Sequence, residues 1–128
     1  MSCGPTRDAR GQSTVELALC LPALAFILAL VVEVGLIASD QARLWHAARE
    51  AARVAIVDPD ESAARAAATR SGLDDLEMSI DPDSAYRVQG RPLEVSLTYR
   101  PDGHVPLVGQ LFGGLVLRSQ VSMRIEQP

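Results

Sequence analysis

One long apolar run dominates the first third of the chain. From Leu17 to Ala38 there are 22 residues with a single charged side chain, that of Glu33. As an α-helix this run would be about 33 Å long, enough to cross a hydrocarbon core of about 30 Å. A protein of this size has no core that could surround such a helix, and the run is too long for a signal peptide. The pattern therefore predicts a transmembrane helix over residues 12–38.

A helical period continues beyond the apolar run, from Ser39 to Val57. Five apolar residues recur there on one predicted face: Ala42, Trp45, Ala48, Ala52 and Ala55. This spacing is typical of an amphipathic helix, which we expect to pack on a small sheet or, alternatively, on a neighbouring helix. Trp45 fits either the membrane interface or an ordinary packing position.

The segment "DPDE" at 58–61 predicts the start of a second, short helix. Asp58 can act as the N-cap, Pro59 fits the first helical position, and Glu61 can complete a capping box. The helix should run to about Ser71 and stop at Gly72. Because this explains the acidic residues locally, and their spacing fits no calcium loop, we expect no metal site here.

The last part of the chain changes to a period of two, which predicts strands. "LEVSLTY" and "LRSQVSMRIE" are strong candidates, and "DLEMSI" at 75–80 is a weaker third. The fifteen residues "RPDGHVPLVGQLFGG" between the strong strands form a long connection with several apolar residues. We expect it to fold back over the sheet, or else to contact another subunit. The fold class is α+β: a long N-terminal helix, a second short helix and an antiparallel sheet of two to three strands.

Charge sets the expected orientation of the span. The N-terminal head carries Arg7 and Arg10 against a single acid, Asp8, so the positive-inside rule places it in the cytoplasm and residues 39–128 outside. The net charge of the chain is −4 and no stretch is strongly basic, which argues against nucleic-acid binding. Cys3 and Cys20 lie before and inside the span and are not expected to form a disulfide.

The chain lacks the sequence patterns of an enzyme. Its two histidines, His46 and His104, have no metal-ligand spacing, and there is no phosphate-binding loop or nucleophile motif. We therefore expect neither catalysis nor a cofactor.

Glu16 is the residue that needs an explanation, because a carboxylate at the start of a membrane helix requires a cationic partner. If Gly11 ended a removed leader, the mature chain would begin at Gln12, whose free amine would lie one turn from Glu16. In a filament, the amine of one subunit could neutralise the carboxylate of the next. Two further positions in the span stand out. Pro22 removes a backbone hydrogen bond, and Glu33 either reaches the interface or contacts a partner helix.

A short basic leader, Gly, four residues, Glu and about 20 apolar residues resemble the signal of type IV prepilins. The stretch "STVELALCLPALAFILALVVEVG" is similar to the start of TadE-like proteins, the minor pseudopilins of tight-adherence (Tad/Flp) pilus systems. The shared features are Val15-Glu16-Leu17, Pro22 and Glu33-Val34-Gly35. "AAREAAR" at 47–53 resembles a second family motif, with Ala51 where the family usually has Gly. "LVLRSQVSMRIE" resembles the closing strand.

The resemblance implies a leader at 1–11, cleavage between Gly11 and Gln12 by a prepilin peptidase, and a pilin-like outer domain. It further implies residence in the cytoplasmic membrane and pilus assembly with other pilin or pseudopilin subunits. Glu16, Pro22, Glu33 and Gly35 would serve assembly or helix packing. Two alternatives stay open. One is an unprocessed, membrane-tethered binding or regulatory module. The other is a pseudopilin of a type II-like secretion system.

Overall fold

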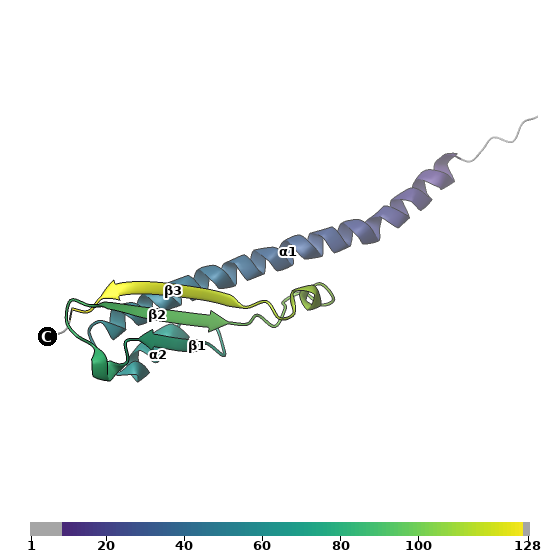
Figure 1. Cartoon of the computed structure of the whole chain (residues 1–128). Helices are drawn as coiled ribbons and strands as arrows, with labels where there is room; N and C mark the ends of the chain where they lie inside the picture. Colours follow the sequence, from purple (N-terminus) through teal and green to yellow (C-terminus); the bar gives the residue numbers. More distant parts are fainter. Residues whose placement is uncertain (1–8, 127–128) are drawn as a thin grey trace, which may run out of the picture.

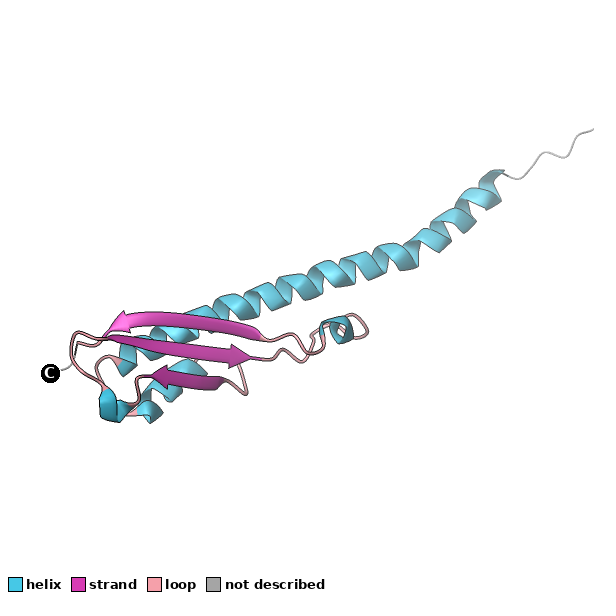
Figure 2. Cartoon of the chain, viewed as in Figure 1, coloured by secondary structure: helices cyan, strands magenta, loops and turns pink. Residues whose placement is uncertain are grey.

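A computed structural model describes residues 9–126 of the chain, and the side chains of residues 11–126. Two helices come first: α1 (Ala9–Ala55) and α2 (Glu61–Thr69). The strands and 3-10 turns follow: β1 (Glu77–Asp81), η1 (Ser84–Tyr86), β2 (Pro92–Tyr99), η2 (Gly109–Phe112) and β3 (Leu117–Arg124). This confirms the predicted α+β fold, with a long helix, a short helix and a small antiparallel sheet (Figures 1 and 2).

The sheet has three antiparallel strands in the order β1-β2-β3. Its register pairs Ile80 of β1 with Val95 of β2, and Val95 in turn with Val121 of β3. On the central strand Leu93, Val95 and Leu97 are fully buried, as their alternation predicted. The weakest of the three predicted strands, near residues 75–80, is confirmed as β1.

The core lies between the sheet, α2 and the C-terminal half of α1. Figure 2 shows the strands beside this half of α1, while the N-terminal half projects away from the domain. The apolar side chains of the sheet meet a layer built largely from alanine: Ala47, Ala48, Ala51, Ala52, Ala55, Ala64 and Ala68. Such small side chains allow the elements to approach one another closely.

The buried face of α1 differs in phase from the predicted one. Ala48, Ala52 and Ala55 are buried as expected, but Ala42 is exposed and Trp45 is 45% exposed. The observed inner face continues through Leu44 to Asp40, Ile37 and Glu33 at helical spacing. The predicted packing face was wrong at Ala42 and Trp45, because it was sought among apolar residues only and the inner face contains two acids. The membrane-interface position of Trp45 stays a prediction.

The start of α2 also lies two residues later than predicted. Asp60, and not Asp58, is the N-cap: its carboxylate accepts bonds from the backbone N–H of Ser62 (2.9 Å) and from the Ser62 hydroxyl (2.7 Å). These two bonds lower the pKa of Asp60, and the bond from the hydroxyl has the larger effect. Asp58 instead accepts a bond from the Asp60 N–H. The helix ends at Thr69, slightly before the predicted stop, and Gly72 has a positive φ of 75°.

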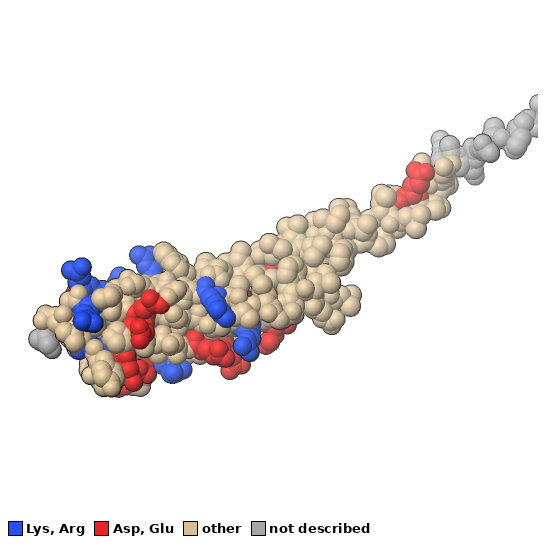
Figure 3. All heavy atoms as spheres, viewed as in Figure 1, with Lys and Arg blue, Asp and Glu red and all other residues tan. Residues whose placement is uncertain are grey.

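The projecting half of α1 is long and apolar enough to cross a membrane. An 18-residue window has a mean hydropathy of 2.6, and none of it is buried against the rest of the chain. Figure 3 shows charged side chains gathered over the folded domain and a long stretch of the projecting helix nearly free of them. One long, bare apolar helix near the N-terminus fits a single-pass membrane protein.

Candidate functional site: the long helix and the loop that binds it

The N-terminal turn of α1 carries the predicted processing and pairing residues. Gly11, Gln12 and Glu16 all lie inside the helix and are exposed, so the helix shows no break at the expected end of the leader. The Gln12 amide donates a long hydrogen bond of 3.4 Å to the Glu16 carboxylate. The two residues therefore face the same side of the helix, one turn apart. Of the predicted leader, residues 1–11, the first eight lie outside the described residues.

Pro22 lies within α1, and the helix continues through it. A proline there cannot donate its backbone hydrogen bond, which favours local bending. Figure 1 shows α1 curving in its N-terminal, purple part. The residue thus shapes the projecting half of the helix without ending it.

The long connection between β2 and β3 does not cover the sheet, contrary to the expectation. It lies alongside α1 instead, at the end of the domain nearest the projecting helix (Figure 1). The reason is Glu33, whose side chain is fully buried there. Its carboxylate accepts hydrogen bonds from two consecutive backbone N–H groups, those of His104 (3.0 and 3.2 Å) and Val105 (2.7 Å).

This contact with the loop was not among the roles that the sequence suggested for Glu33. The interface position and the contact with a partner helix stay predictions. The carboxylate is satisfied by the loop's own backbone, as a buried charge requires. Glu33 therefore couples the long helix to a segment 71 residues further along the chain.

The imidazole of His104 joins Glu33 to a second acid, Asp40. Its Nε2 lies 3.1 Å from a carboxylate oxygen of Asp40, and its Nδ1 lies 3.7 Å from one of Glu33. The two acids are seven residues apart on the same face of α1, with side chains 0% and 7% exposed, whereas His104 is 32% exposed. A protonated imidazole at this position would compensate part of their negative charge. Nearby Tyr99 has a raised pKa, because of burial first and the charge of Asp40 second.

Two glycines let the loop fold tightly over Glu33. A Cβ placed on Gly109 would lie 2.8 Å from the Gly103 Cα, and one placed on Gly103 would lie 2.9 Å from the Gly109 Cα. The Gly103 φ of 74° also lies in the region that favours glycine. Any side chain at either position would force the two segments of the loop around Gly103 and Gly109 apart.

Gly35 is different, because no residue that the structure describes comes close to its Cα on the side where a Cβ would lie. A Cβ at this position would meet no atom within 4 Å. The residue is exposed on α1, two positions after the buried Glu33. If Gly35 serves close packing, the contact must come from another molecule.

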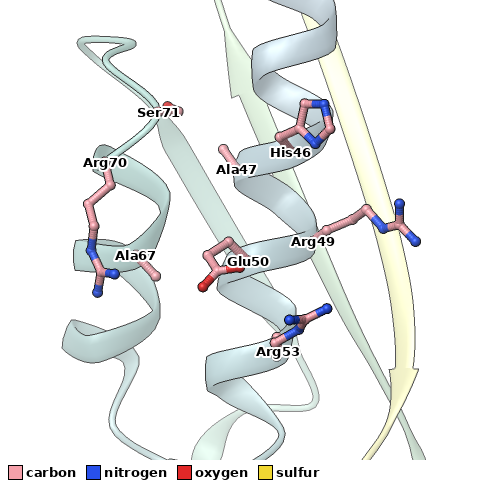
Figure 4. Close-up of a pocket in the computed structure, with 8 residues that line it drawn as sticks. All are labelled: His46, Ala47, Arg49, Glu50, Arg53, Ala67, Arg70 and Ser71. Carbon is pink, nitrogen blue, oxygen red and sulfur yellow. The ribbon is translucent and has the colours of Figure 1, made fainter.

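The motif "AAREAAR" divides into a buried and an exposed face. Ala47, Ala48, Ala51 and Ala52 are in the core, so the methyl group of Ala51 is buried. The charged residues line a shallow pocket between α1 and α2, whose members include His46, Arg49, Glu50, Arg53 and Arg70. Figure 4 shows Glu50 directed into the space between the helices and Arg49 pointing away from α2. The guanidinium of Arg49 lies over the Trp45 ring at 4.4 Å.

Neither histidine forms part of a metal centre in the described part of the chain. Among residues whose side chains are described, no group of three or more His, Cys, Asp or Glu could hold a metal ion. The sequence found Glu33 but missed Asp40 and His104 as its neighbours. The available signal was their position: Asp40 is two turns after Glu33, and His104 directly precedes the uncharged part of the long loop.

Comparison with known proteins agrees with the resemblance inferred from the sequence. A family model described as TadE-like protein matches residues 11–53. The match lies within α1 and contains Gly11, Glu16, Pro22, Glu33 and Gly35, as well as the motif at 47–53. It does not extend to the sheet, so the resemblance of the last strand stays a prediction. No curated protein and no solved structure matches the chain.

Proposed function

We propose that this chain, which is TadE-like over residues 11–53, is a minor pseudopilin that acts in the assembly of a tight-adherence pilus. The observation that carries the proposal is the bare N-terminal half of α1. Its large apolar side chains are mostly exposed, such as Leu19 at 74% and Val31 at 63%. Such a surface requires lipid before assembly, and can be covered by neighbouring helices afterwards.

In this proposal a prepilin peptidase cleaves between Gly11 and Gln12. The chain then lies in the cytoplasmic membrane with its N-terminus on the cytoplasmic side and residues 39–128 outside. Cleavage creates a positive amine on Gln12. Because Gln12 and Glu16 face the same side of α1, the new amine lies close to the carboxylate of its own chain and can also reach that of a neighbour.

In this proposal, processing gives Glu16 a new, positively charged partner. An amine and a carboxylate at the edge of the apolar span interact strongly because water is scarce there. Between two subunits, the pair would fix how far one helix slides along the next. Gly35, with open space around it, offers a second place for close helix contact at the other end of the span.

Complementation of a strain lacking this chain tests the function. The unaltered chain should restore surface filaments counted by electron microscopy. A Gly11→Val variant, which changes the cleavage position and leaves the rest of the chain intact, should reach the membrane and give few or no filaments. Equal piliation by the two proteins would contradict the processing step. Normal piliation in the strain without the chain would contradict the role in assembly, and would favour the unprocessed binding module. A secretion defect with intact pili would favour the type II-like alternative.

A further inference from the structure

The connection between β2 and β3 contains an uncharged stretch that the proposed function leaves unused. From Val105 to Val116 there is no charged residue, and Asp102 and Arg118 lie just outside this range. We call residues 105–116 the apolar tip. Leu107 is 79% exposed and Leu111 65% exposed. An exposed apolar group of this kind indicates a surface that something covers.

The position of the apolar tip along α1 indicates what covers it. If the span begins after Glu16, about 20 residues are needed to cross the hydrocarbon core, which places its outer edge near Leu36. Glu33 is then about 4.5 Å inside that edge. The hydrogen bonds from His104 and Val105 hold the base of the tip at the level of Glu33. The tip therefore begins at the depth of the outer leaflet.

The tip also extends further along the span. In Figure 1 the connection, including η2, lies beside α1 on the side of the domain that faces the projecting helix. Ala29 and Leu30 are half-buried, whereas the preceding Ile27 and Leu28 are exposed. The tip thus lies next to a part of α1 whose remaining surface, including Val31 and Val34, is exposed and apolar. Whatever surrounds this part of α1 also surrounds the tip.

Several backbone N–H groups of the tip are hydrogen-bonded within the chain, which favours an apolar environment. Polar backbone groups in lipid must be satisfied within the protein. The N–H of Val105 is bound by Glu33, and Pro106 has no N–H. Five further backbone N–H groups donate hydrogen bonds to carbonyl oxygens within the tip. The pairs, donor first, are Val108 to Pro106, Gly109 to Val105, Leu111 to Val108, Gly113 to Gln110 and Leu115 to Phe112.

We propose that the apolar tip inserts into the outer leaflet of the membrane beside α1. This inference rests on the proposed membrane span. The folded domain is then held to the bilayer at two points, the helix and the tip, which restricts its rotation and tilt. The loop also shields the Glu33 carboxylate from lipid, because the backbone N–H groups of His104, just before the tip, and of Val105, its first residue, occupy that carboxylate.

Depth-dependent fluorescence quenching tests the proposal on the full chain. The chain has one tryptophan, so Trp45→Phe provides a background for single-tryptophan variants. Leu111→Trp reports on the tip, Leu24→Trp on the span, and Val88→Trp on an exposed residue just before the start of β2, at the far end from the tip. Each protein is reconstituted in phosphatidylcholine–phosphatidylglycerol vesicles, with or without brominated acyl chains. Leu107→Trp is a second tip variant, and circular dichroism confirms that each variant folds.

The expected result is quenching by brominated lipid for Leu111→Trp and Leu24→Trp, and none for Val88→Trp, which aqueous iodide should quench. Iodide quenching of both tip variants without lipid quenching would overturn the proposal while leaving the span intact. Protection of both tip variants from both quenchers would also overturn it, and would mean that protein covers the tip. Absence of lipid quenching for Leu24→Trp would overturn the membrane span and this inference with it.

Discussion

The backbone N–H of Val105 donates a 2.7 Å hydrogen bond to the carboxylate of Glu33, joining residues 72 positions apart. This bond and its neighbour from His104 fix the loop between β2 and β3 to the long helix. The exposed half of α1 and the folded domain are therefore connected by more than the continuous helix. The connection lies where the apolar span meets the domain.

Removal of the Glu33 carboxylate should release the loop. In Glu33→Ala the N–H groups of His104 and Val105 lose their acceptor, and the loop must open to let water reach them. We expect amide hydrogen exchange at these two residues to accelerate by about tenfold or more in detergent-solubilised protein. Glu33→Gln, which keeps one acceptor oxygen, should show a smaller effect. Glu50→Ala removes an exposed acid and should leave exchange in the loop unchanged. Unaltered exchange in Glu33→Ala would show that the bonds do not hold the loop.

A methyl group at Gly109 should destabilise the same loop by a different route. Its Cβ would lie 2.8 Å from the Gly103 Cα, and the backbone there cannot move aside without opening the loop. We expect Gly109→Ala to lower the free energy of unfolding by about 1–3 kcal/mol, as measured by chemical denaturation. A stability equal to that of the unaltered protein would contradict the close approach of the two glycines.

Gly35→Ala is the matched comparison, with the opposite expected sign. The site is open and helical, so the methyl group should stabilise the isolated chain by about 0.5–1 kcal/mol. If Gly35 packs against a helix of another subunit, the same variant should reduce piliation in cells. Increased stability together with normal piliation would remove Gly35 from the assembly surface.

Glu16→Ala should separate insertion from assembly. Loss of one carboxylate from the edge of the span makes membrane insertion easier, so the protein should remain in the membrane fraction. Without the carboxylate, the amine of Gln12 has no partner between subunits, and we expect almost complete loss of filaments. Glu50→Ala again provides a control, because Glu50 lies far from the span. Normal piliation by Glu16→Ala would contradict the proposed pairing.

The N-cap of α2 should add a pH-dependent contribution to stability. Hydrogen bonds from Ser62 hold the folded-state pKa of Asp60 below its ordinary value of 3.8. The stabilisation is therefore complete above pH 3.8 and is lost as the pH falls through the lower, folded-state value. Asp60→Asn keeps a capping oxygen but cannot titrate. Thermal unfolding between pH 2 and 7 should fall less steeply at the acidic end for this variant, and an identical profile would contradict the assignment.

The sequence predicted the elements well because each has a strong local signal. The apolar run and the period-two strands required no knowledge of the rest of the chain. The inner face of α1 could not be placed in the same way, because Glu33 and Asp40 occupy positions where an apolar residue is expected. Alanine also occurs on both the buried and the exposed face of a helix, so its presence at position 42 did not show which face that position belongs to.

The Glu33–Asp40–His104 cluster could not be predicted from the sequence, for a related reason. The pairing joins a helix to a loop more than 60 residues later, and most of its hydrogen bonds come from backbone N–H groups. Every residue except proline has a backbone N–H, so the residue type does not show which N–H will act as a donor. Gly103 and Gly109 allow the tight fold of the loop, but their identity does not show which residue the loop binds.

The most direct test of the account is the mass of the native protein extracted from membranes of its own cells. The account predicts a mature chain that begins at Gln12, in which the new amine and Glu16 lie one turn apart. An intact protein that retains residues 1–11, or one cleaved at any other position, would contradict it.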